Sequence, residues 1–212
     1  MSNLIDIFLH LDKHLKVIME QYGWETYLIL FLVIFCETGL VVLPFLPGDA
    51  LLVAAGVTWA TAGSNPVLLM VVLAVAAVTG NMVNYAVGKY FGDWVERKKF
   101  IKHEHLEQTH NFYERYGAVT LVVARFVPIV RTMAPFVAGA GEMSYPRFAL
   151  YNLVGGISWV FSLVFLGWAF GTTPFVQQNL SYITLGIIAV TTLPVLFTLA
   201  RQLFGRKRSE EA

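Results

Sequence analysis

The sequence predicts an all-α polytopic membrane protein, built as an inverted repeat of a re-entrant hairpin plus a transmembrane helix, with about four full crossings and two re-entrant hairpins. The 212 residues are 57% hydrophobic and 14% charged, and the mean hydropathy of +0.63 is too high for an ordinary soluble domain. Proline interrupts two of the apolar runs, and Lys and Arg are distributed unevenly between the loops.

Six apolar runs approach the length of about 20 residues that a helix needs to span the hydrocarbon layer. They cover residues 25–43, 45–62, 66–88, 118–141, 147–171 and 181–200. The second run opens with Pro44, Pro47 and Gly48, and the fourth contains Pro128 and Pro135. Because proline removes a backbone donor and clashes with the preceding turn, we expect these two segments to be broken helices.

The distribution of loop charge favours re-entrant hairpins over six full crossings. With six crossings, the basic link 89–115 would face the opposite side from the basic tail, although cytoplasmic loops tend to share an excess of Lys and Arg. If the second and fourth runs are re-entrant, all 15 Lys and Arg residues except Arg125 and Arg131 become cytoplasmic, as do both termini. Segments 63–65 and 172–180, which lack Lys and Arg, then face outward. Six crossings and a mixed arrangement remain as alternatives.

This topology divides one membrane domain, residues 1–212, into successive segments. A hairpin followed by a crossing helix occurs at 44–88 and again at 118–171, and the two hairpins open to opposite faces, as in alternating-access transporters. The N-terminal amphipathic helix lies either on the membrane surface or in solvent against the protein. The flanking segments are this helix at 1–22, a cytoplasmic amphipathic link at 89–116, a C-terminal helix at 181–204 and a basic and acidic tail at 205–212.

Glu37 and Asp49 are acidic residues within apolar sequence, on either side of a proline-broken turn. A charge at bilayer depth costs about 2.5–3.5 kcal/mol on insertion scales, so such residues tend to be paired, inward-facing and functional. Burial favours the neutral form of Glu37 unless a cation is near, which makes it a candidate proton carrier. Asp49 either shares this site or only caps the helix that begins after Gly48.

Arg125 and Arg131 stand on either side of a helix-breaking proline in the fourth run. Arginine stays charged at biological pH and binds phosphate or carboxylate through two parallel hydrogen bonds. With Thr132 as a further donor, the two arginines form the candidate phosphate-binding site, and Glu37 and Asp49 are the candidate proton-coupling or ion-pair residues. In the alternative interpretation, the arginines only neutralise the two acids and hold the hairpins together.

Other polar residues give weaker signals. Asn81, Asn84 and Asn152 either line a cavity or make hydrogen bonds between helices. The histidines of the 89–116 link lack the fixed geometry of a metal site, and no nucleophile elbow, zinc-binding helix or phosphate-binding glycine loop occurs. The sequence therefore predicts no metal, no cofactor and no enzyme activity. A net charge of +1 gives no indication of nucleic-acid binding.

Several separated motifs follow one another along the chain: the stretch from Glu37 to Asp49 ending in Phe-Leu-Pro-Gly-Asp, Gly80 with Tyr85 and Gly88, Arg125-Phe126-Val127-Pro128, Arg131-Thr132, Ala138-Gly139, Phe148, Asn152, Gly155, Trp159, Gly167 and Gly171. In this order they resemble the DedA family, whose members are also described as SNARE-associated or VTT-domain proteins, and the similarity is greatest to its bacterial inner-membrane branch. The similarity covers nearly the whole chain. One departure is Asn81, where many members carry an acidic residue, so the resemblance implies no proton role there.

The resemblance implies a membrane transporter, or flippase, of an anionic lipid carrier such as undecaprenyl phosphate, with proton coupling and a role in envelope biogenesis and membrane-potential homeostasis. It also implies the bacterial inner membrane as location, membrane lipid and protons as partners, and essential roles for Glu37, Asp49, Arg125 and Arg131. A proton-coupled cation or drug exporter and a non-transporting scaffold or assembly factor are the alternatives. The oligomeric state stays open, with a homo-oligomer among the options.

Overall fold

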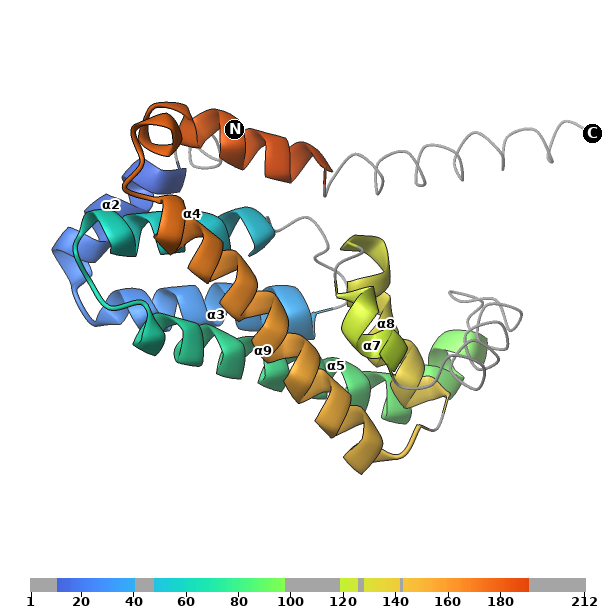
Figure 1. Ribbon diagram of the computed structural model, residues 1–212. Helices are drawn as coiled ribbons and strands as arrows, with labels where there is room; N and C mark the ends of the chain where they lie inside the picture. The colour runs from blue at the N-terminus through green and yellow to red at the C-terminus, as the bar shows by residue number, and fades with distance from the viewer. Residues whose placement is uncertain (1–10, 41–47, 98–118, 126–127, 142, 191–212) are drawn as a thin grey trace, which may run out of the picture.

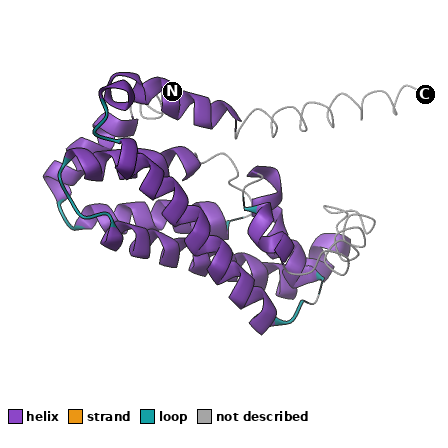
Figure 2. Ribbon diagram, viewed as in Figure 1, coloured by secondary structure: helices purple, strands orange, loops and turns teal. Residues whose placement is uncertain are grey.

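The computed structural model describes residues 11–40, 48–97, 119–125, 128–141 and 143–190 (Figure 1). All regular structure within these residues is helical, which confirms the all-α class (Figure 2). Residues 1–10, the turn with Pro44 and Pro47, most of the predicted link at 89–116 and the C-terminal segment 191–212 lie outside the described residues. The helices are α2 (Leu11–Tyr22), α3 (Glu25–Gly39), α4 (Gly48–Thr61), α5 (Val67–Arg97), α7 (Val119–Ala124), α8 (Pro128–Ala140), α9 (Tyr145–Phe170) and a further helix at 174–190.

Two of these helices, α5 and α9, are long and apolar enough to cross a membrane. The suitable segments are Val67–Phe91, with 25 residues, and Tyr145–Phe170, with 26, and they coincide with the predicted runs 66–88 and 147–171. The α3 and α4 helices have 15 and 14 residues, whereas a crossing needs about 20. Helix α3 ends at Gly39, inside the described residues, whereas α4 and the helix at 174–190 border residues outside them. The crossings predicted for the first and last apolar runs and the re-entrant hairpins stay predictions.

The fourth apolar run is a broken helix, as its prolines predict. Helix α7 ends at Ala124, Arg125 lies in a turn, and α8 begins at Pro128. Proline suits the first position of a helix because the amide it lacks would be unpaired there anyway. The second proline of the run, Pro135, lies inside α8 without ending it. The break therefore occurs at one proline, and it leaves Arg125 on non-helical backbone.

Close glycine contacts join each short helix of one predicted repeat to the long helix of the other. In the α4–α9 pair, a Cβ at Gly56 or Gly167 would overlap backbone atoms of the partner helix. In the α5–α8 pair, the same holds at Gly88, against Phe136, and at Gly139, against the backbone of α5. Small residues allow helices in lipid to approach closely enough for extensive van der Waals contact. The two halves of the chain are thus packed reciprocally, α4 on α9 and α8 on α5.

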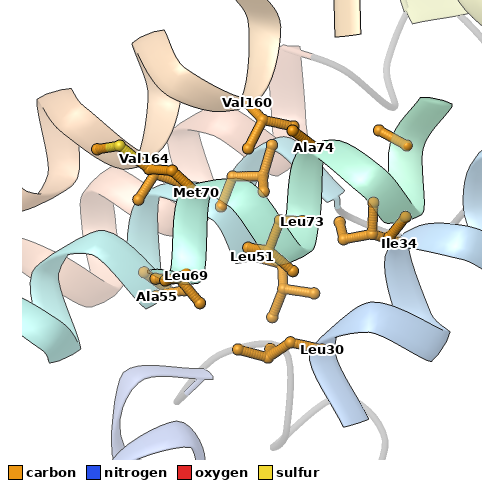
Figure 3. Close-up of a cluster of buried hydrophobic side chains, with 14 of the residues drawn as sticks. Leu30, Ile34, Leu51, Ala55, Leu69, Met70, Leu73, Ala74, Val160 and Val164 are labelled. Atoms are coloured by element: carbon orange, nitrogen blue, oxygen red, sulfur yellow. The ribbon is translucent and has the colours of Figure 1, made fainter. Parts of the chain in front are cut away.

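The apolar core lies where α3, α4, α5 and α9 meet (Figure 3). Leu30 and Ile34 of α3 approach Leu73 of α5, and Val160 and Val164 cover the α5 side from α9 (Figure 3). The outer faces of α5 and α9 also carry large apolar side chains, whereas several polar and charged side chains are buried. This distribution suits a protein surrounded by lipid, because apolar side chains then face the hydrocarbon and polar side chains are buried within the protein.

Candidate functional site

The Arg131 guanidinium binds both predicted acids at once. Its Nη2 lies 2.5 Å from Glu37 Oε1, and its Nη1 lies 2.6 Å from Asp49 Oδ1. Glu37 is in the last turn of α3, Asp49 is the second residue of α4, and Arg131 is in the first turn of α8. The three side chains are largely removed from solvent, with 2%, 15% and 12% exposure respectively. One arginine therefore ties together three helices from the two halves of the chain.

Two glycine contacts position the Glu37 carboxyl group. The end of α3 packs against α5 where Gly39 approaches the Gly80 backbone, and a Cβ at Gly80 would overlap Thr38. The Glu37 carboxyl lies directly against Gly48 at the start of α4, where a Cβ would occupy the space of the carboxyl oxygens. The Gly-Asp pair at the beginning of α4 thus provides the space for one acid and contributes the second.

Trp159 of α9 contacts the ion-pair cluster formed by Glu37, Asp49 and Arg131. Its indole Nε1 donates a hydrogen bond to Asp49 Oδ1 at 2.8 Å, and Arg131 Cζ lies 5.0 Å from the centre of its ring. A cation over an aromatic face is attracted by the ring quadrupole. Trp159 was not among the predicted site residues. A signal was present, since Trp159 is seven residues after Asn152 and therefore lies on the same helix face.

Arg125 has a different set of partners from Arg131. Its side chain is 5% exposed, and Nη2 donates to the Asn152 backbone oxygen at 3.2 Å and to Asn152 Oδ1. The Asn81 amide is satisfied when its oxygen faces Arg125, which then donates to it at 2.6 Å, while Asn81 Nδ2 donates to Thr38 O at 3.2 Å. Gly155 and Gly156 lie against the Arg125 side chain and leave room for it.

Both arginines and one of the acids line a single small cavity. Its lining residues are Glu37, Thr38, Asn81, Arg125, Arg131 and Trp159. The free space accommodates about one water molecule, so a phosphate group does not fit while these side chains keep their positions. The cavity can hold an anion near two guanidinium groups only after its walls have moved apart.

The other predicted site residues have distinct positions. Asn84 is buried, and its Nδ2 donates to Thr38 O at 3.2 Å. Asn152 is buried, and its Nδ2 donates to Val78 O at 2.9 Å while its oxygens bind Arg125. Thr132 belongs to α8, but its side chain lies outside the described part of the structure. Since Asp49 binds Arg131 and Trp159, helix capping is not its sole role.

Comparison with known proteins identifies the family. The VTT domain model matches residues 46–169, from the start of α4 almost to the end of α9. Protein DedA of Escherichia coli strain K12 is 47% identical over 203 residues, which cover 93% of each chain. The chain belongs to the DedA family.

Further relatives support the membrane location of this chain. An uncharacterized membrane protein of Mycobacterium leprae is 40% identical, over 77% of this chain and 75% of the relative. Inner membrane protein YqjA of Escherichia coli strain K12 is 34% identical, over 70% and 69% of the two chains. No solved structure gives a significant match. Together with the two long apolar helices, these relatives make the chain a membrane protein, and none of their names denotes an enzyme.

Proposed function

We propose that this chain is a flippase that moves an anionic lipid carrier, such as undecaprenyl phosphate, across the cytoplasmic membrane in support of envelope biogenesis and membrane-potential homeostasis. The observation that carries the proposal is the Arg131 bridge to Glu37 and Asp49 beside the buried Arg125. A phosphate headgroup needs a cationic path with hydrogen-bond donors, and guanidinium groups bind phosphate bidentately. The isoprenoid tail can remain in the surrounding lipid during transfer.

Exchange of partners at Arg131 is the central step of the proposed cycle. Removing one partner from a buried ion pair costs about 3–5 kcal/mol, because the other charge is left uncompensated. Arg131 therefore leaves its two carboxylates only if another anion replaces them or if protons neutralise them. Protonation of Glu37 and Asp49 would release Arg131 to the phosphate, which links headgroup movement to the proton gradient.

The reciprocal packing of the two halves supports an alternating-access mechanism. Glu37 and Asp49 come from α3 and α4 in the first half of the chain, whereas Arg131 comes from α8 in the second half. The ion pairs among these three residues therefore hold the two halves together. The cavity holds about one water molecule, and headgroup binding thus requires that α8 and the first-half helices separate. In this proposal the two hairpins are re-entrant, both termini are cytoplasmic, and the discontinuous segments meet near the membrane midplane.

The substitution Arg131→Gln tests the proposal directly. Glutamine keeps polar atoms but removes the charge and the bidentate geometry, so we expect lipid-phosphate flipping in proteoliposomes to fall to the protein-free rate. Arg147→Gln is the matched control, because Arg147 lies on the exposed first turn of α9, outside the cavity. This control variant should flip at nearly the wild-type rate.

The flipping measurement needs equal insertion of both variants and is made with and without a pH gradient. Wild-type flipping that does not respond to the gradient would remove proton coupling from the proposal while leaving the flippase intact. Wild-type rates for an Arg131→Gln protein that is folded and inserted would contradict the role of the arginine and, with it, the flippase proposal.

A proton-coupled cation exporter is the second candidate, because the ion-pair cluster contains two acids and one base. In an exporter the acids bind the cargo, and Glu37→Gln should abolish pH-driven efflux of a cation such as ethidium. Arg131→Gln should affect that efflux less, since the arginine would only compete with the cargo. Robust ethidium efflux by wild-type proteoliposomes that show no lipid-phosphate flipping would favour the exporter.

A further inference from the structure

The carboxyl group of Glu37 lies over the beginning of helix α4. Gly48 is the first residue of α4 and is buried, and a Cβ built on it would overlap Glu37 Oε2 before any other atom. The first N–H groups of a helix point out of its N-terminus and together act as a partial positive charge. Carboxylates and phosphates are the anions that bind at this position. A carboxylate of the chain itself therefore lies where a helix N-terminus would hold a bound anion.

The two oxygens of the Glu37 carboxyl group differ in their partners. Oε1 accepts a hydrogen bond from Arg131 Nη2 at 2.5 Å, whereas the buried Oε2 has no hydrogen-bond partner within the described part of the chain. Leaving a buried acceptor unpaired is unfavourable, and more so when the acceptor is charged. Asp49 is held more firmly, because its Oδ1 accepts from both Arg131 and Trp159. Glu37 is thus the acid that an incoming anion displaces more easily.

The groups around the Glu37 carboxyl suit a phosphate as well as a carboxylate. Arg131 binds it from α8, the beginning of α4 lies against it, and both arginines line the adjoining cavity. Guanidinium groups and helix N-termini each bind phosphate oxygens. When both acids are charged, Glu37 and Asp49 balance the charges of Arg125 and Arg131. The position therefore accepts a second anion only after Glu37 has been neutralised or has moved away.

We propose that the beginning of α4 at Gly48, together with Arg131, forms the phosphate seat of this protein, and that Glu37 occupies the seat as an internal substitute for the ligand. This inference rests on the proposed transport of a lipid phosphate and names the groups that receive its headgroup. The headgroup replaces the Glu37 carboxylate between Gly48 and Arg131, and the return of the carboxylate expels it. A free phosphate ion has the same chemistry, so the test includes both ligands.

The test compares Glu37→Ala with the double variant Glu37→Ala/Gly48→Ala by titration calorimetry of the purified full-length chain in detergent. Farnesyl phosphate, inorganic phosphate and farnesol are the probes. Glu37→Ala empties the phosphate seat, so we expect the affinity for farnesyl phosphate to rise at least tenfold over wild type, with no change in farnesol binding. The methyl group of Gly48→Ala refills the space of the carboxyl oxygens, so the double variant should return to within threefold of wild type.

Glu25→Ala is the matched control, because Glu25 lies in the exposed first turn of the same helix. It removes the same charge far from α4 and should bind farnesyl phosphate as wild type does. If Glu37→Ala does not fold, Glu37→Ser and its double variant with Gly48→Ala take its place with the same expected changes.

The double variant separates occupation of the seat from a simple loss of negative charge. A gain in affinity that survives Gly48→Ala would come from charge alone and would overturn the inference. A Glu37→Ala affinity within threefold of wild type or below it, or a parallel rise in farnesol binding, would overturn it as well. In either case wild-type flipping in proteoliposomes would still support the proposed function.

The proposed function has its own failure. Wild-type protein that flips no lipid phosphate would overturn the flippase, even if Glu37→Ala gains affinity for phosphate and the double variant loses it. Inorganic phosphate that binds Glu37→Ala as tightly as farnesyl phosphate does would overturn the assignment of the seat to a lipid headgroup.

Discussion

Trp159 contacts both members of the Asp49–Arg131 ion pair and also lines the cavity. The indole nitrogen fixes one Asp49 oxygen, and the ring face lies beside the Arg131 guanidinium. With 2% exposure, Trp159 also shields this part of the pair from solvent. The hydrogen bond that Trp159 donates and the packing of its ring can be tested separately, because phenylalanine retains an aromatic ring but lacks the N–H donor.

Trp159→Phe should therefore weaken the site without collapsing the fold. Loss of a hydrogen bond to a charged acceptor costs about 1.5–3 kcal/mol, and Asp49 is only partly buried, so we expect a cost near the lower end of that range. The thermal midpoint in detergent should fall by a few degrees, and the rate of lipid-phosphate flipping should fall with it.

Trp168→Phe is the control for this substitution, since Trp168 lies on the same helix, is 36% exposed and is outside the cavity lining. It should leave flipping at the wild-type rate. If Trp159→Phe lowers neither the thermal midpoint nor the flipping rate relative to this control, the indole hydrogen bond contributes nothing to the site.

The helices of the two halves approach each other through glycines, and these contacts hold the charged residues in place. Gly56 lets α4 meet α9, which brings Asp49 toward Trp159, and Gly88 lets α5 meet α8, which brings Arg131 toward the acids. In each case the atoms that a Cβ would meet belong to the backbone of the neighbouring helix. Backbone cannot rotate away as a side chain can, so even one methyl group forces the helices apart.

Gly56→Ala and Gly88→Ala should each destabilise the protein by about 1–3 kcal/mol, the usual cost of overpacking a close contact. Gly186→Ala is the matched control, because Gly186 is also helical and a Cβ at this position would meet nothing within 4 Å. Alanine there should be neutral or slightly stabilising, since alanine is the better helix former by about 1 kcal/mol. Thermal midpoints of the three variants in detergent provide the measurement. Equal midpoints would mean that the glycine contacts are not tight.

At the scale of the whole molecule, the sequence predicts elements better than it predicts their contacts. Local physics determines the break at Pro128 and the long apolar helices, and both occur in the structure. Helix α5 continues to Arg97, past the end of the apolar run 66–88. The apolar run indicates which part of a helix can lie in lipid, but it does not indicate where the helix ends.

The pairing of the charged residues could not be predicted in the same way. Arg131 meets residues 94 and 82 positions away, and this choice depends on how α3, α4 and α8 pack. The sequence alone left open which acid pairs with which arginine. In the structure both acids pair with Arg131, whereas Arg125 donates to the side-chain amide of Asn152. Trp159 was missed although its seven-residue spacing from Asn152 places it on the same helix face, because that spacing does not show that this face meets the ion pair.

The proposed topology makes a prediction about the two ends of α9. A helix of 26 residues is about 39 Å long, which exceeds the hydrocarbon thickness of about 30 Å, so its ends should lie on opposite sides of the membrane. Ser144 and Thr172 are exposed residues just outside these ends. In a Cys36→Ala background, Thr172→Cys should react with a membrane-impermeant maleimide in intact cells, whereas Ser144→Cys should react only after the membrane is permeabilised.

This labelling result would also place the charge of Arg147 in the cytoplasm, because Arg147 lies at the same end of α9 as Ser144. A cytoplasmic Arg147 agrees with the excess of Lys and Arg in cytoplasmic loops. Labelling of both cysteines in intact cells would show that α9 does not cross, and labelling of Ser144→Cys alone would invert the topology.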